Sequence, residues 1–185
     1  VNGEGWLKNG IQCDLTVIPI KNYNRNAIYE LPVKPSPNLP NWESVYLYPT
    51  LCFFEGSIVS VGRGTETPFQ IYGHPTMRGS YTFTPQSTGG ATRPLLEGQR
   101  CRGEHLVDFA LDYAHNDNQL HLEWVIEAYQ QLKDKEFFTN YFQLLAGDKQ
   151  LQRDIENGKN AEEIRASWND DLEAFKAIRA KYLMY

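Results

Sequence analysis

The alternation of apolar and polar residues predicts short β-strands before residue 117. The expected strands are β-branched runs or alternate with a period of two, which places apolar side chains on one face. They are Leu15–Ile20, Ser57–Val61, Phe69–Tyr72, Tyr81–Thr84 and Val107–Ala114. Pro19 fixes its own φ and is expected to end the first of them.

After residue 117 the period changes to that of an α-helix. We expect a helix from Asn118 to about Lys133, because apolar residues in this segment recur on one helical face. These residues are Leu122, Val125, Ile126, Tyr129 and Leu132. Asp148 is expected to cap a second helix that Gly158 terminates.

A third helix is expected to start at Asn160, because Glu163 follows three residues later as in a capping box. Apolar residues recur along it every three or four positions, at Ile164, Trp168, Leu172, Phe175, Ile178 and Tyr182. Such a stripe predicts docking against the core.

Strands followed by helices indicate an α+β fold rather than a doubly wound sheet. We expect a small mixed or antiparallel sheet with long Pro/Gly-rich loops, followed by a C-terminal segment of about three helices. The chain is expected to form one domain over residues 1–185. Residues 1–116 would form its strand and loop part and residues 117–185 its helical part.

The segment Pro35–Pro75 differs from the rest because its prolines hold the backbone extended. Asn41 is expected to cap a short helix that Pro49 ends. For residues 50–54 the sequence permits a helical turn or a strand, and we favour the turn.

The long loop 84–103, rich in Thr, Gly, Pro and Arg, has the length of a functional lid.

Composition narrows the class of protein. The chain has 185 residues, 41% hydrophobic and 22% charged, as in a soluble globular protein. A net charge of −5 without a basic run argues against nucleic acid as a partner, and no apolar run is long enough to span a membrane. Three widely spaced cysteines, Cys13, Cys52 and Cys101, are expected to be buried free thiols. The histidines lack the paired spacing of metal ligands, so neither a metal nor a cofactor is predicted.

Two turns inside Pro35–Pro75 carry candidate chemistry. Glu55 lies between Phe54 and a glycine, and a carboxyl group that aromatic side chains desolvate suits a general acid. Arg63 lies between two glycines, so that backbone can approach a ligand while the guanidinium binds a carboxylate, and Thr65 adds a hydroxyl. A solvated turn glutamate and an exposed turn arginine are the alternatives.

Further candidates have a structural alternative as well. Asn38, on a stiff frame of prolines, suits a sugar hydroxyl or acetamido group, and Ser36 belongs to the same string. A structural amide that bridges loop backbone is equally compatible with the sequence. His74 is the histidine within the special segment. No nucleophilic triad is indicated, and Glu55 has no evident second acid for glycoside hydrolysis.

Several motifs follow one another along the chain: Pro-Ser-Pro-Asn-Leu-Pro at 35–40, Tyr-Pro at 48–49, Phe-Glu-Gly at 54–56, Gly-Arg-Gly-Thr at 62–65, Pro-Phe at 68–69 and Tyr-Gly-His-Pro at 72–75. In this order they resemble one family, the bacterial exo-β-N-acetylmuramidases. Gly-Glu-Gly-Trp at 3–6, Ser-Trp-Asn-Asp-Asp-Leu at 167–172 and the last seven residues are also similar. The resemblance covers the C-terminal part of a family member, without its N-terminal Rossmann-like domain.

The resemblance implies release of terminal N-acetylmuramic acid from the non-reducing end of peptidoglycan fragments, in cell-wall recycling or scavenging. Glu55 would be the catalytic acid of this half, and the substrate-binding residues would be Ser36, Asn38, Arg63, Thr65 and His74. The implied partners are the muramic acid-containing glycan and the N-terminal domain, and the implied location is periplasmic or secreted. The alternative is a non-catalytic carbohydrate-binding or interaction domain of a cell-wall protein.

Overall fold

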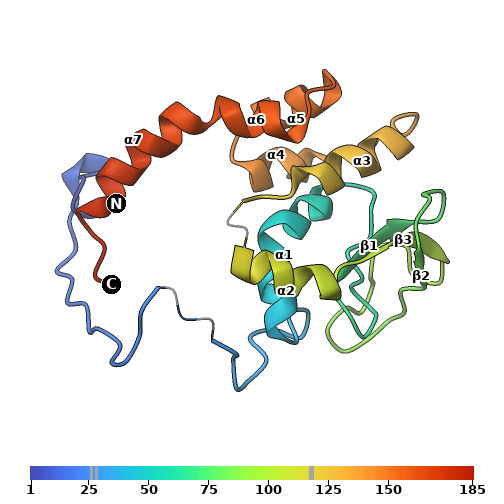
Figure 1. Ribbon diagram of the computed structural model, residues 1–185, viewed down its shortest axis with the longest axis horizontal. Coiled ribbons are helices and arrows are strands. Elements are labelled where there is room, and N and C mark those ends of the chain that lie inside the picture. The colour runs from blue at the N-terminus through green and yellow to red at the C-terminus, as the bar shows by residue number, and fades with distance from the viewer. Residues whose placement is uncertain (26, 28, 117–118) are drawn as a thin grey trace. The chain divides into compact units, whose positions relative to one another are not determined.

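The computed structural model describes residues 1–25, 27, 29–116 and 119–185, and these form two compact units. The terminal unit consists of Val1–Ala27 and Ala174–Tyr185, and the central unit of Ile28–Glu173. The boundary falls within the last helix (Figure 1).

The sheet of the central unit is small and antiparallel. Its strands are β1 (Ile71–His74), β2 (Tyr81–Phe83) and β3 (Cys101–His105), in the order β1-β3-β2. Among the described residues, the helices of ten or more residues are α1 (Trp42–Leu51), α2 (Val107–Asn116), α3 (Leu122–Leu132) and α7 (Asn169–Ala180). The shorter helices are η1 (Lys8–Gly10), η2 (Cys52–Gly56), α4 (Asn140–Ala146), α5 (Gln150–Glu156) and α6 (Ala161–Ser167). The predicted α+β class with C-terminal helices is confirmed.

Helix α1 begins as predicted but does not end at Pro49. Asn41 and Ser44 form a reciprocal capping box at its start. Pro49 lies inside the helix, which runs on to Leu51 and continues as η2. Burial explains the continuation, because Leu51 is fully buried and the hydroxyl of Thr50 accepts a hydrogen bond from the His121 backbone N–H at 3.0 Å. The favoured helical turn over residues 50–54 is confirmed.

The strand expected over residues 107–114 is wrong, because this segment forms α2. Leu106, Phe109 and Ala110 contact the core, and their spacing of three and four residues is that of a helix face. Loop 84–103 is also shorter than expected, since β3 begins at Cys101.

The strand expected over residues 57–61 is replaced by isolated bridges, Ser57 with Phe138 and Ser60 with Gly73. The Ser57 hydroxyl accepts from the Val59 N–H and the Ser60 hydroxyl from the Gly62 N–H. Serine side chains that bond their own backbone compete with a continuous strand ladder.

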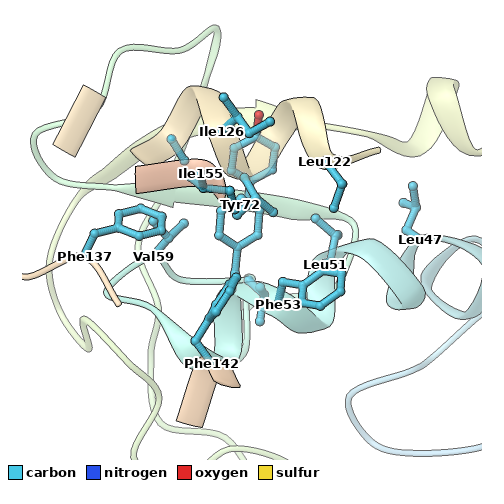
Figure 2. Packing of buried hydrophobic residues seen from close by; sticks show 14 of the residues in the cluster. Leu47, Leu51, Phe53, Val59, Tyr72, Leu122, Ile126, Phe137, Phe142 and Ile155 are labelled. Carbon is cyan, nitrogen blue, oxygen red and sulfur yellow. The ribbon is translucent and has the colours of Figure 1, made fainter. Parts of the chain in front are cut away.

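An aromatic core holds the central unit together. Phe54 of η2 stacks on Tyr72 of β1 with ring centroids 4.8 Å apart, and Phe53 packs on Phe142 of α4 at 5.8 Å. Figure 2 shows Phe53, Tyr72 and Phe142 below Leu122 and Ile126 of α3. Gly56 fits directly against the Phe142 backbone, where a Cβ atom would overlap the Phe142 Cα. The core therefore fixes η2 against α4.

The C-terminal helices agree with the sequence in part. Asn160 and Glu163 form the predicted capping box of α6, and Asp148 accepts hydrogen bonds from the first amides of α5. The apolar stripe belongs to two helices rather than one, α6 and α7. Ile164 is buried, but Leu172 and Phe175 are 45% and 49% exposed, so that docking of the whole stripe is wrong for the described residues.

The terminal unit joins the two ends of the chain. Glu4 accepts hydrogen bonds from Tyr182 at 2.6 Å and from Lys181 at 3.0 Å. The expected strand Leu15–Ile20 has no secondary structure and lies exposed, as does Cys13, while Cys101 is buried.

Candidate functional site

Glu55 and Arg63 form an ion pair. Arg63 Nη2 donates a hydrogen bond to Glu55 Oε1 at 2.5 Å, and both side chains are partly exposed. Glu55 belongs to η2, which its buried neighbours Phe53 and Phe54 anchor in the core. The acidic and the basic candidate of the sequence therefore lie at one place.

The turn that carries Arg63 needs its two glycines. Gly62 and Gly64 have φ of 76° and 81°, in the left-handed region that glycine adopts without strain. A Cβ atom at Gly64 would also overlap the carbonyl oxygen of Gln86. Thr65 closes the turn, since its N–H and its hydroxyl both donate to the Gly62 carbonyl, at 3.0 and 2.7 Å.

The guanidinium of Arg63 retains a donor. Its Cζ lies 5.3 Å from the centroid of the Phe69 ring, a cation–π contact. Arg63 Nε is buried and has no hydrogen-bond partner among the described residues. A buried donor without a partner is costly, so Arg63 gains if its side chain moves and brings Nε to an acceptor on a ligand.

A cavity of about 130 Å³ lies beside the pair, lined by Glu55, Val59, Ser60, Val61, Arg63 and Leu95. Leu95 comes from loop 84–103, which the sequence indicated as a lid. Sites for whole small-molecule ligands measure about 300–1,000 Å³. The cavity is therefore smaller than a site for a complete small-molecule ligand.

Two neutral side chains lie close to the charge of Glu55. Burial, and then the Glu55 carboxylate, raise the pKa of Cys52 to about 11, so its thiol stays protonated and is no nucleophile at neutral pH. The same two causes raise the pKa of Tyr48, whose ring lies 5.0 Å from that of Phe69. The Tyr48 phenol therefore keeps its proton at neutral pH.

Ser36 and Asn38 have structural roles in this chain. Asn38 Nδ2 donates to the Gly90 carbonyl at 2.8 Å, and its backbone N–H donates to the Ser36 hydroxyl at 3.2 Å. These contacts join the Pro-rich segment to loop 84–103. The amide nitrogen of Asn38 is thus used within the protein, in agreement with the structural alternative.

Thr65 and His74 are likewise occupied. The Thr65 hydroxyl serves the turn described above. His74 Nδ1 accepts from the Thr76 N–H at 3.2 Å, which leaves the ring proton on Nε2. Burial and then Lys135 lower the pKa of His74, so the ring is neutral at pH 7. Ser36, Asn38, Thr65 and His74 do not line the cavity beside Glu55.

Sequence reasoning did not identify Tyr48, Cys52 and Leu95 as neighbours of the candidate site. The first two share one side of a continuous helical segment with Glu55, because positions 48, 52 and 55 are spaced by four and three residues. The expectation that Pro49 ends the helix concealed this spacing. Leu95 gives no local signal, since only the folded loop brings it to the cavity.

Among the described residues that line the cavity, Glu55 is the only one with a carboxylate. Hydrolysis of a glycosidic bond ordinarily uses two. Within the described part of the chain, no group of three His, Cys, Asp or Glu residues is placed to hold a metal ion. No helix in the same residues is long and apolar enough to cross a membrane.

Comparisons with known proteins agree on one family. The family model described as "Exo-beta-N-acetylmuramidase NamZ, C-terminal" matches residues 46–185. The chain is 32% identical over 194 residues to the peptidoglycan beta-N-acetylmuramidase NamZ of Bacillus subtilis (strain 168), covering 95% of this chain and 46% of that protein. It matches the crystal structure of a DUF1343 family protein from Bacteroides fragilis NCTC 9343 with a TM-score of 0.90 and 45% identity, covering 100% of this chain and 52% of that one. The chain thus spans about half the length of these relatives.

Proposed function

This chain belongs to the family of C-terminal domains of the exo-β-N-acetylmuramidase NamZ, and we propose that it supplies one wall of the active-site cleft of such an enzyme. The full-length protein would hydrolyse terminal N-acetylmuramic acid from the non-reducing end of peptidoglycan fragments. The observation that carries the proposal is the Glu55–Arg63 pair at the cavity, with one buried donor of Arg63 unused.

Glu55 is the acid of this half of the site. A carboxylic acid that protonates the leaving oxygen accelerates glycoside cleavage, and a second carboxylate on the other side of the bond completes the reaction. Since no second carboxylate lines the cavity in the part of the chain that the structure describes, the preceding half of the protein supplies it in our proposal. An anionic substrate that binds Arg63 would separate it from Glu55 and leave the carboxyl group available for the leaving oxygen.

Arg63 binds the lactyl carboxylate of muramic acid. This group distinguishes muramic acid from the related amino sugar that lacks it. A guanidinium binds a carboxylate through charge-assisted hydrogen bonds. Arg63 Nε is a donor that has no hydrogen-bond acceptor among the described residues. In our proposal Ser36, Asn38, Thr65 and His74, whose polar groups make hydrogen bonds within the chain, support the site from outside the cavity.

The size of the cavity favours shared construction of the site. A substituent-sized pocket leaves most of the sugar to be held by other groups. Orienting groups on both sides of a substrate supply much of the effective molarity of an enzyme, so this chain alone would have little or no activity. With peptidoglycan fragments as substrate, we place the full-length protein in the periplasm or outside the cell, which fractionation of cells tests.

The deciding experiment is Glu55→Gln in the full-length protein. We expect turnover to fall by about 100- to 10,000-fold while the melting temperature stays close to that of the wild type. Glu66→Gln, at an exposed position of the neighbouring turn, is the matched control. Unchanged turnover in Glu55→Gln would remove the catalytic role and leave the alternative, a non-catalytic carbohydrate-binding or interaction domain.

A further inference from the structure

The run Leu15–Ile18 is exposed although its composition is that of a buried strand. Leu15, Val17 and Ile18 are 62%, 53% and 86% exposed. Side chains of a strand alternate between two faces, and this run has apolar residues on both. Near-continuous apolar runs are typical of strands in sheets that are covered on both faces.

The backbone of the same run is unpaired. Within the described residues, none of the backbone groups of residues 14–18 takes part in a hydrogen bond. A row of free N–H and C=O groups beside apolar side chains is a template for strand addition. Water can satisfy these groups, but it cannot bury the side chains.

Both ends of the run are held in place. Cys13 exchanges two hydrogen bonds with the Asn2 side chain, at 2.9 and 3.1 Å. At the other end, the Ile20 N–H donates to the Tyr185 hydroxyl at 2.6 Å, and Tyr23 packs edge-on against the same ring. The terminal unit therefore presents the run between two anchors and leaves its middle open.

The relatives indicate what covers it. The family model of the C-terminal domain begins at residue 46, so the run lies outside it, and the chain spans about half the length of its relatives. Because the matching family model is described as C-terminal, we infer that the uncovered half of those relatives precedes it. Because Asn2 is bonded to Cys13, residues that precede Val1 in a full-length protein would leave the unit close to the start of the run.

We propose that Leu15–Ile18 is a strand of a β-sheet in the preceding half of the full-length protein, and that Pro19 ends its pairing. The terminal unit would then contribute a strand to the sheet of the preceding half, and this strand would connect the two halves. A sheet with cover on both faces is the partner, since only this arrangement buries both faces of the run. The inference does not rest on the catalytic assignment of Glu55.

Hydrogen exchange of the full-length protein tests the proposal. We expect the amides of residues 15–18 to exchange at least about 100-fold more slowly than in an unstructured peptide, because ladder hydrogen bonds must open first. The protection should not depend on protein concentration. Exchange at the rate of an unstructured peptide would overturn the proposal, and so would protection that appears only at high concentration, since a second copy would then cover the run.

A pair of variants supports the same test. Val17→Gln in the full-length protein should lower the melting temperature by several degrees, because it places an amide in a covered sheet face. Leu144→Gln, on α4 with its side chain 75% exposed, is the matched control and should leave the melting temperature unchanged. Equal melting temperatures for the two variants would contradict the burial of Val17. Muramidase turnover is not part of either readout, so failure of the catalytic proposal leaves this one standing.

Discussion

Arg63 binds Glu55 through a single nitrogen, Nη2, at 2.5 Å from Oε1, while its Nε remains buried and without a partner among the described residues. A bidentate pair would use two nitrogens of the guanidinium and would leave less for a ligand. The observed pair holds the acid at the cavity and leaves Nε as a donor through which a substrate anion can compete with Glu55 for Arg63.

The first prediction concerns this donor. In the full-length protein, Arg63→Ala should weaken binding of fragments that end in N-acetylmuramic acid by about 1.5–3 kcal/mol, the value of a hydrogen bond to a charged group. Binding of analogues that lack the lactyl carboxylate should change much less. Calorimetric titration with both ligands measures the difference, and Arg93→Ala, at an exposed position, is the control. Equal losses on the two ligands would end the assignment of Arg63 to the carboxylate.

The second prediction concerns the turn that holds Arg63. Gly64→Ala should lower the free energy of unfolding by about 1–3 kcal/mol, since φ is 81° and the new Cβ meets the Gln86 carbonyl. Denaturant titration measures this loss. A Cβ at Gly89 has open space, so Gly89→Ala serves as the control and should be close to neutral. A Gly64→Ala variant as stable as the wild type would show that the turn tolerates rearrangement.

The third prediction separates the two roles that the sequence leaves open for Asn38. Asn38→Ala removes the hydrogen bond to the Gly90 carbonyl and should lower the free energy of unfolding by about 0.5–1.5 kcal/mol. Amide exchange in the loop around Gly90 should become faster. If stability and exchange stay unchanged while sugar binding weakens, Asn38 is a ligand contact and the structural account is wrong.

The fourth prediction concerns pH. Burial alone would raise the pKa of Asp154, but hydrogen bonds from Lys159 and Gln150 outweigh it and lower the pKa below its ordinary value. Asp154 therefore adds stability above the pKa of an unfolded aspartate, about 3.9, and this stability is lost as the pH falls through the lower folded value.

Melting temperatures measured from pH 7 down to pH 2 test this behaviour. The wild type should lose more stability below about pH 4 than Asp154→Asn, which has no carboxylate to protonate. Asp134→Asn, at an exposed position, should follow the wild-type curve. Parallel curves for the wild type and Asp154→Asn would contradict the lowered pKa.

Local signals in the sequence predicted local structure well. The predicted N-cap at Asn41 and the predicted capping box at Asn160 depend on groups within three residues, and such signals survive in any tertiary context. The alternation over residues 107–114 failed because Ala110 fits a strand pattern and a helix face equally well. Tertiary packing decided between the two, and no local pattern contains that information.

The site followed the same division. The sequence indicated Glu55 and Arg63 as an acidic and a basic candidate on two turns. It did not predict that they form an ion pair, because their contact depends on η2 and on two glycines with left-handed backbone conformation. It also gave Asn38 and Thr65 a possible ligand, whereas the fold uses their polar groups for its own turns and loops. A polar side chain on a rigid loop is often part of what makes the loop rigid.

The close fit of Gly56 against the Phe142 backbone has a consequence for any attempt to move this site to another protein. Glu55 precedes Gly56 directly, so its position depends on a helix that lies far along the chain. A transplanted Pro35–Pro75 segment would keep the sequence of the motif but lose the surface that sets the acid in place. Only a transplant that carries α4 with it would reproduce the site.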